Sequence, residues 1–196
     1  MKLEQVEELV LQSLEHEMGG VHVYSTALKC AANEDLKEEW EKYLEQTRGH
    51  VQKLKEVCRA LGIDADRETS GRKVVRHLGE ALVDAMKRAL GAGDPVAAEL
   101  VACECVVLAE TKDHLDWELL GKCAEHVAGK KGDVLRDACE EVEDQEDEHL
   151  YHTRGWCREL WCQSLELKAV LPPPEERRHV KTAIGAARAE QSVTKR

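Results

Sequence analysis

The residues best suited to chemistry lie in the segment 142–156, VEDQEDEHLYHTRGW, where a carboxylate and an imidazole interrupt an apolar pattern. Read as a helix, the segment has a stripe of inward positions that advances in alternating steps of three and four. Glu146 and His149 occupy two of those positions. Because carboxylates and imidazoles are common metal ligands, the segment predicts a metal-binding position inside a helical bundle.

Three other apolar stripes carry the same kind of interruption, at Glu17, His50 and Glu110. Counting residues from the predicted hairpin turns places all of these side chains near mid-height of a bundle. Clustered buried carboxylates repel one another and resist ionisation, whereas one or two divalent cations offset both costs. Carboxylate oxygens and imidazole nitrogens suit iron or manganese, and the absence of an inward thiolate nearby argues against a zinc–cysteine site.

Four long helices must position these groups. Asn33 and Asp94 are predicted N-caps, the latter followed by a proline at the first helical position. Gly62 is a predicted helix stop, Asp133 is predicted to cap the last long helix, and the triple proline is expected to end that helix after Leu171. The predicted helices span about residues 2–31, 34–61, 95–128 and 134–171.

The chain is expected to form one all-α domain over residues 1–171. Charged residues make up 34% and aromatic residues only 4%, which is typical of long solvated helices rather than of sheets. The two short links predict two antiparallel hairpins, and the segment 63–93 predicts a crossover that contains an extra amphipathic helix. The architecture expected is therefore a four-helix bundle with one additional helix.

An internal repeat supports this architecture. An offset of 93 residues aligns the first helix with the third, and an offset of 99 aligns the second with the fourth. A duplication of residues 1–62 as 94–168 is the economical explanation. The aligned pairs are Glu17 with Glu110, Tyr24 with Trp117, Gln46 with Gln145, Thr47 with Glu146, and His50 with His149.

From residue 1 to about residue 168 the sequence resembles the ferritin-like superfamily, the di-iron carboxylate bundles of bacterioferritin and rubrerythrin type. In that superfamily two helices each give one Glu and two give Glu-x-x-His. Glu17 and Glu110 match the single glutamates, and Glu146 with His149 matches one Glu-x-x-His. The stretch LEQTRGHVQKL, residues 44–54, is similar to stress-associated bacterial members. The resemblance implies iron as the cofactor, with manganese as an alternative.

The second Glu-x-x-His is incomplete, since Thr47 stands where the superfamily has a glutamate that bridges the two metals. The centre therefore holds either two ions or one. Gln46, Thr47 and His114 are candidates for an additional ligand or for a group that contacts a ligand. Tyr24 is the candidate catalytic residue, because it lies two turns from Glu17, near enough to donate a hydrogen bond or an electron.

The resemblance implies ferroxidase chemistry, or consumption of dioxygen or hydrogen peroxide, in iron handling or oxidative stress. Ferrous iron and O2 or H2O2 would be the substrates of this oxidoreductase. An alternative is a non-catalytic bundle with a degraded centre, which binds metal or docks a partner. A third alternative is a scaffold without metal, in which the inward ionisable residues pair with one another.

The acidic balance, a net charge of −11, argues against nucleic acid as a partner. We expect a cytoplasmic protein that does not bind membranes, because no stretch has the apolar length of a signal peptide or a membrane span. A homodimer is compatible with the sequence. The basic tail, residues 172–196, is expected to be flexible, and its part from 175 to 196 is a candidate for docking a partner. The eight cysteines include no Cys-x-x-Cys pair, and most are expected to be reduced.

Overall fold

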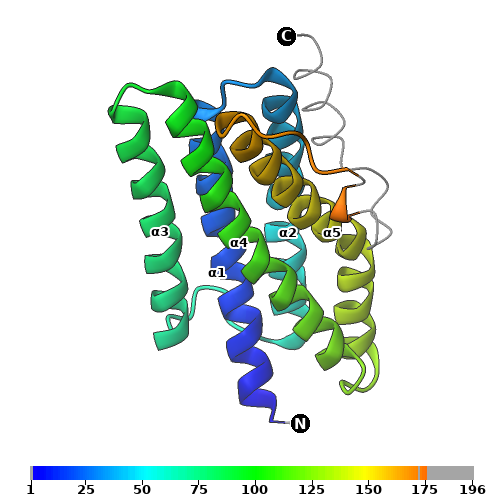
Figure 1. Cartoon of the computed structure of the whole chain (residues 1–196). Coiled ribbons are helices and arrows are strands. Elements are labelled where there is room, and N and C mark those ends of the chain that lie inside the picture. Colours follow the sequence, from blue (N-terminus) through cyan, green and yellow to red (C-terminus); the bar gives the residue numbers. More distant parts are fainter. Residues whose placement is uncertain (1, 172, 176–196) are drawn as a thin grey trace.

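The part of the chain that the structure describes folds into five α-helices packed as a bundle (Figure 1). The computed structural model describes residues 2–171 and 173–175, and these residues contain no strand, so the prediction of an all-α chain is confirmed. Most of the predicted docking tail lies outside the described residues. The helices are α1 (Leu3–Cys30), α2 (Glu34–Leu61), α3 (Ser70–Gly91), α4 (Pro95–Ala124) and α5 (Lys130–Ser164).

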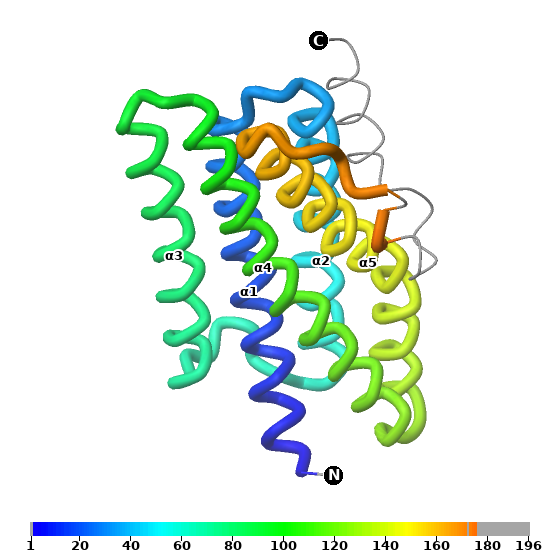
Figure 2. The backbone as a smooth tube through the Cα atoms, in the orientation of Figure 1, coloured from blue at the N-terminus to red at the C-terminus, as the bar shows by residue number. Residues whose placement is uncertain are grey.

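The helices pair in the order that the short links predict. Helix α1 packs antiparallel to α2, and α4 packs antiparallel to α5 (Figure 1). We call these pairs the first hairpin and the second hairpin. Helix α3 carries the chain back along the outside of the bundle, against α1 and α4 (Figure 2). The expected crossover with an extra helix is thus present, and α1 contacts α4 where the two hairpins meet.

Most helix ends follow the predicted signals. The Asn33 side chain accepts a hydrogen bond from the backbone N–H of Leu36, and the Asp94 side chain accepts from those of Val96 and Ala97. These bonds satisfy N–H groups that have no partner inside the helix. Gly62 ends α2 with a φ of 78°, in the left-handed region that glycine adopts without strain.

Two predicted boundaries of the last helix are wrong. Helix α5 begins at Lys130, so Asp133 lies inside its first turn, where it pairs with Arg136 instead of capping the helix. It ends at Ser164, well before Leu171. The backbone N–H of Leu167 donates to the carbonyl of Cys162, while Glu166 has a φ of 55°. This is the Schellman pattern, and no glycine stands at that position to indicate it from the sequence.

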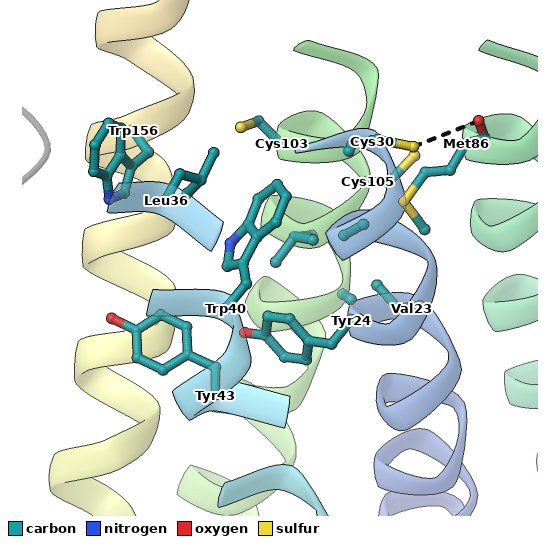
Figure 3. Close-up of a cluster of buried hydrophobic side chains, with 14 of the residues drawn as sticks. Val23, Tyr24, Cys30, Leu36, Trp40, Tyr43, Met86, Cys103, Cys105 and Trp156 are labelled. Carbon is teal, nitrogen blue, oxygen red and sulfur yellow. Dashed lines mark hydrogen bonds between the residues drawn. The ribbon is translucent and has the colours of Figure 1, made fainter. Parts of the chain in front are cut away.

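Two apolar clusters fill the interior above and below mid-height. One contains Tyr24, Trp40 and Trp156 and extends to Met86 of α3 (Figure 3). The other contains Leu14, Trp117 and their neighbours. The candidate ligands lie in sequence between the members of these clusters on every long helix, so the core consists of two dry compartments with a polar layer between them.

Ion pairs fix α3 against α1. Glu15 is 5% exposed and binds two arginines of α3: Arg72 Nη2 lies 2.8 Å from Glu15 Oε2, and Arg76 Nε lies 2.6 Å from Oε1. Arg72 also donates to the carbonyls of Ala65 and Arg67. A buried pair needs such extra bonds to offset its desolvation.

Among the described helices, none combines the length and apolarity that crossing a membrane requires.

Candidate metal centre

Five side chains that the sequence singles out come together in the polar layer. They are Glu17 of α1, His50 of α2, Glu110 of α4, and Glu146 and His149 of α5. Their ligand atoms form two groups, Glu17–His50–Glu146 and Glu110–Glu146–His149, and the atoms of each group lie within 4.8 Å of one another. Glu146 belongs to both groups. The arrangement is that of two adjacent three-ligand sites joined by one carboxylate.

All five side chains are almost completely buried. Glu17 and His149 are fully buried, and none of the others is more than 3% exposed. Ionised groups are seldom placed so deeply unless something compensates their charge. The apolar clusters on either side prevent them from turning toward solvent, so any compensation has to come from within the bundle.

Each histidine is oriented by a glutamine of the opposite hairpin. His50 Nε2 lies 2.9 Å from Gln145 Oε1, and His149 Nε2 lies 3.0 Å from Gln46 Oε1. A glutamine carbonyl oxygen only accepts, so Nε2 carries a proton in both rings. The Nδ1 atoms then point toward the carboxylates. A ring held through its outer nitrogen in this way is typical of a metal ligand, because the bond fixes its tautomer and direction.

The two imidazoles differ in charge when no metal is present. His50 Nδ1 lies 3.3 Å from Glu17 Oε1 and 3.1 Å from Glu146 Oε1. Burial alone would lower the pKa of His50, but these two carboxylates raise it to about 11. His149 Nδ1 is 3.5 Å from Glu110 Oε2, and burial lowers the pKa of His149 to about 4. One imidazolium therefore compensates part of the negative charge.

That compensation is incomplete. Burial raises the pKa values of Glu110 and Glu146, which shows how unfavourable their ionised forms are here. Within the described part of the chain, Glu17 Oε2, Glu110 Oε2 and both carboxylate oxygens of Glu146 lack a hydrogen-bond partner, as do both Nδ1 atoms. Buried polar atoms almost always have partners. Apart from the close contacts of the two Nδ1 atoms with these carboxylates, six ligand atoms in one layer have no hydrogen bond, which fits a bound cation.

Two aromatic residues lie against the carboxylates. Trp117 Nε1 donates to Glu17 Oε1 over 2.7 Å. Tyr24 is fully buried and its hydroxyl lies beside Glu110, although no hydrogen bond of good geometry forms in the described structure. Each aromatic thus contacts the single glutamate of the other hairpin. Tyr24 is in the layer where the sequence placed it, and its catalytic role stays a prediction.

The three additional candidates lie around the centre rather than in it. Gln46 contacts the outer nitrogen of His149, as described above. Thr47 is 3% exposed, and its hydroxyl donates to the carbonyl of Tyr43 in its own helix over 2.9 Å. His114 Nε2 lies 2.7 Å from Asp147 Oδ1 at the partly exposed edge between α4 and α5. Neither Thr47 nor His114 belongs to the two ligand groups.

Sequence reasoning missed Asp113. This residue is 5% exposed, and its Oδ1 has no hydrogen-bond partner among the described residues. Burial raises the pKa of Asp113 well above its usual value, and the charges of Glu146, Glu17 and Glu110 raise it further. Asp113 follows Glu110 by three residues, so the two share one face of a helix. The three-residue spacing from Glu110 was therefore the signal in the sequence that could have identified Asp113.

A cleft of about 700 Å³ between α4 and α5 reaches the centre from outside. Glu146 and Trp117 line its inner end, and the His114–Asp147 pair lines its edge. The remaining acidic side chains outnumber the two basic ones, Lys122 and Arg136. These acidic residues are Glu118, Glu125, Glu140 and Glu143.

Fold and site together define an all-helical bundle with buried carboxylate and histidine groups that could hold metal ions. The donor set, three carboxylates and two imidazoles, fits a divalent metal ion, and the atoms without a hydrogen bond fit a cation in the polar layer. A scan against models of protein families, a search of curated proteins and a search of solved structures found no match to this chain.

Proposed function

We propose that the chain is a ferritin-like bundle that binds two divalent metal ions, iron foremost, and oxidises ferrous iron or consumes dioxygen or hydrogen peroxide. The observation that carries the proposal is the pair of three-ligand groups that share Glu146. One group would bind each ion, with Glu146 between them. Manganese is the alternative metal, because it accepts the same ligands.

Bound iron would supply electrons to an oxidant. The protein would hold the ions, orient the ligand side chains and keep bulk water away from them. Glu17 and His50 would hold one ion, while Glu110 and His149 would hold the other. Gln145 and Gln46 keep the imidazole Nδ1 atoms directed inward. The apolar clusters exclude bulk water, which strengthens the attraction between carboxylates and cations. Only a neutral His50 imidazole can offer Nδ1 to a cation, so its proton would be released to solvent on metal binding.

Access from outside is proposed to run through the cleft between α4 and α5. It ends at Glu146, whose two carboxylate oxygens have no hydrogen-bond partner among the described residues. Acidic walls concentrate cations and speed their arrival. Tyr24, whose hydroxyl lies beside Glu110, would donate a hydrogen bond or an electron within the centre.

Metal analysis with controlled ferrous loading tests the proposal. Protein purified without chelator would be loaded with ferrous iron under anaerobic conditions, its iron content measured, and oxidation followed on admission of air or peroxide. We expect two ions per chain and oxidation faster than that of iron in buffer. A Glu110→Ala variant is the control and should bind fewer ions. Wild type that binds no metal at any loading would overturn the proposal.

A second candidate function is favoured by Thr47. Threonine has no carboxylate to offer a second ion, and its hydroxyl is already bonded to the Tyr43 carbonyl. The bundle would then be a metal-binding or partner-docking protein without redox activity. One ion per chain that stays reduced in air would support this candidate over the first.

A further inference from the structure

A buried aspartate next to the two ligand groups has no cation to compensate it. Asp113 is one helical turn after Glu110 on α4, is 5% exposed and has an orphaned Oδ1 among the described residues. Asp116, equally buried on the same helix, is instead paired with Lys112, whose Nζ lies 2.5 Å from Asp116 Oδ2. One buried aspartate of α4 is therefore satisfied by the protein and the other is not.

The surroundings of Asp113 are the carboxylates of the centre. The charges that act on it most strongly are those of Glu146, Glu17, Glu110 and Asp116, and all of them repel an ionised Asp113. An unpaired buried carboxylate costs several kcal/mol by order of magnitude. A residue in that position is hard to explain as a packing element, since leucine or asparagine would fill the space without the repulsion. It is explained if a positive charge enters the same layer.

The number of positive charges that would enter the layer can be compared with the number of carboxylates there. Two divalent ions carry four positive charges, whereas Glu17, Glu110 and Glu146 supply three negative charges and neutral histidines supply none. A fourth carboxylate makes the loaded interior neutral, which a medium of low polarity strongly favours. Thr47 cannot supply it, because threonine has no charge.

We propose that Asp113 is the fourth carboxylate of the centre and takes over, from the opposite hairpin, the charge that Thr47 lacks. The inference rests on the proposed function and deepens it: Asp113 would bind the second divalent metal ion. Asp113 is not a member of the two ligand groups, so it reaches the ion after a side-chain rotation or through one ordered water, a contact nearly as favourable as a direct one.

The test compares two isosteric substitutions on α4. Wild type, Asp113→Asn and the matched control Asp116→Asn would be titrated anaerobically with Mn²⁺ and with Fe²⁺, and bound metal measured by equilibrium dialysis. We expect two ions in wild type and in Asp116→Asn. In Asp113→Asn we expect a second ion bound at least tenfold more weakly, and a metal-free melting temperature no lower than that of wild type.

Two ions bound with wild-type affinity in Asp113→Asn would overturn this inference and leave the proposed function standing. Wild type without metal would overturn the proposed function, and the inference with it. A double variant tests the replacement itself: Thr47→Glu should restore the second ion in the Asp113→Asn background. A folded double variant that still binds a single ion would contradict the claim that Asp113 compensates for Thr47.

Discussion

The first hairpin and the second hairpin contribute unequally to the centre. The second gives Glu110, Glu146 and His149, and it borders the cleft, whereas the first gives Glu17 and His50. Yet both hairpins orient their histidines alike, each through a glutamine of the other. Exchanged contacts of this kind are what a duplicated half-bundle would produce, and the duplication itself stays a prediction.

The two hairpins show that the orientation of a ligand side chain and the number of carboxylates near it depend on different residues. At Thr47 the first hairpin has no carboxylate, but His50 still points inward, since its Nε2 is held by Gln145 and not by the residue one turn earlier. A ligand can therefore change in one half while the frame that aims the remaining ligands persists. The two halves need to match in their hydrogen bonds more than in their charges.

The largest effect is expected where the halves meet. Glu146→Gln removes the carboxylate that both ligand groups share, so we expect the loss of both metal ions. Because Glu146 Oε1 lies 3.1 Å from Nδ1 of the protonated His50, the neutral amide leaves that buried imidazolium with less counter-charge, and the metal-free melting temperature should fall. Metal analysis and thermal unfolding with and without Mn²⁺ check both parts. Retention of two ions would show that the halves are independent.

The second-largest effect is expected on the stability of the protein. Glu15 of the first hairpin pairs with Arg72 and Arg76 of α3, and the second hairpin has no matching contact among the described ion pairs. Glu15→Gln leaves Arg72 buried without its counter-charge, and we expect a loss of about 3 kcal/mol in the free energy of unfolding. Glu68→Gln, which removes only a solvent-exposed partner of Arg76, is the matched control and should leave it nearly unchanged. Urea unfolding measures both.

The same variant has a defined pH dependence. Burial alone would raise the pKa of Glu15, but the hydrogen bonds from Arg76 and Arg72 lower it below its usual value. The contribution of a carboxylate with a lowered pKa is complete above its unfolded pKa, about 4.3, and is lost as pH falls through the folded value. The difference between wild type and Glu15→Gln should thus be constant near neutral pH and shrink below about pH 4.

A smaller effect compares the two glutamines directly. Gln145→Leu and Gln46→Leu each remove the partner of one imidazole Nε2, and we expect a loss of metal affinity of roughly 10- to 100-fold for either. The two losses should be similar, since the two bonds have nearly the same length, 2.9 and 3.0 Å. Calorimetric titration with Mn²⁺ measures them. A large loss for one and none for the other would break the equivalence of the halves.

The smallest effect is expected at Thr47 itself. Thr47→Val keeps the shape of the side chain and removes a hydroxyl whose bond is to its own helix, and such bonds to the i−4 carbonyl add little stability. Metal stoichiometry and affinity should be unchanged. A tenfold loss of affinity would instead make Thr47 a participant in the centre.

The sequence alone was enough for the frame and for five residues of the centre. The apolar period of long helices, the caps at Asn33 and Asp94, and the stop at Gly62 are local signals, because each depends on neighbours within one turn of the chain. Ionisable residues on an apolar stripe can likewise be recognised from the local sequence. The all-α fold and the inward positions of Glu17 and His50 followed from such patterns.

Tertiary structure decided what depends on residues far apart in the chain. The sharing of Glu146 by two ligand groups, the exchange of Gln46 and Gln145 between hairpins, and the isolation of Asp113 beside a paired Asp116 all involve helices whose rotation and relative height no local pattern fixes. The early end of α5 at a non-glycine Schellman turn belongs here too. A stripe shows which side chains point inward, but only packing determines which of them meet and which remain without a partner.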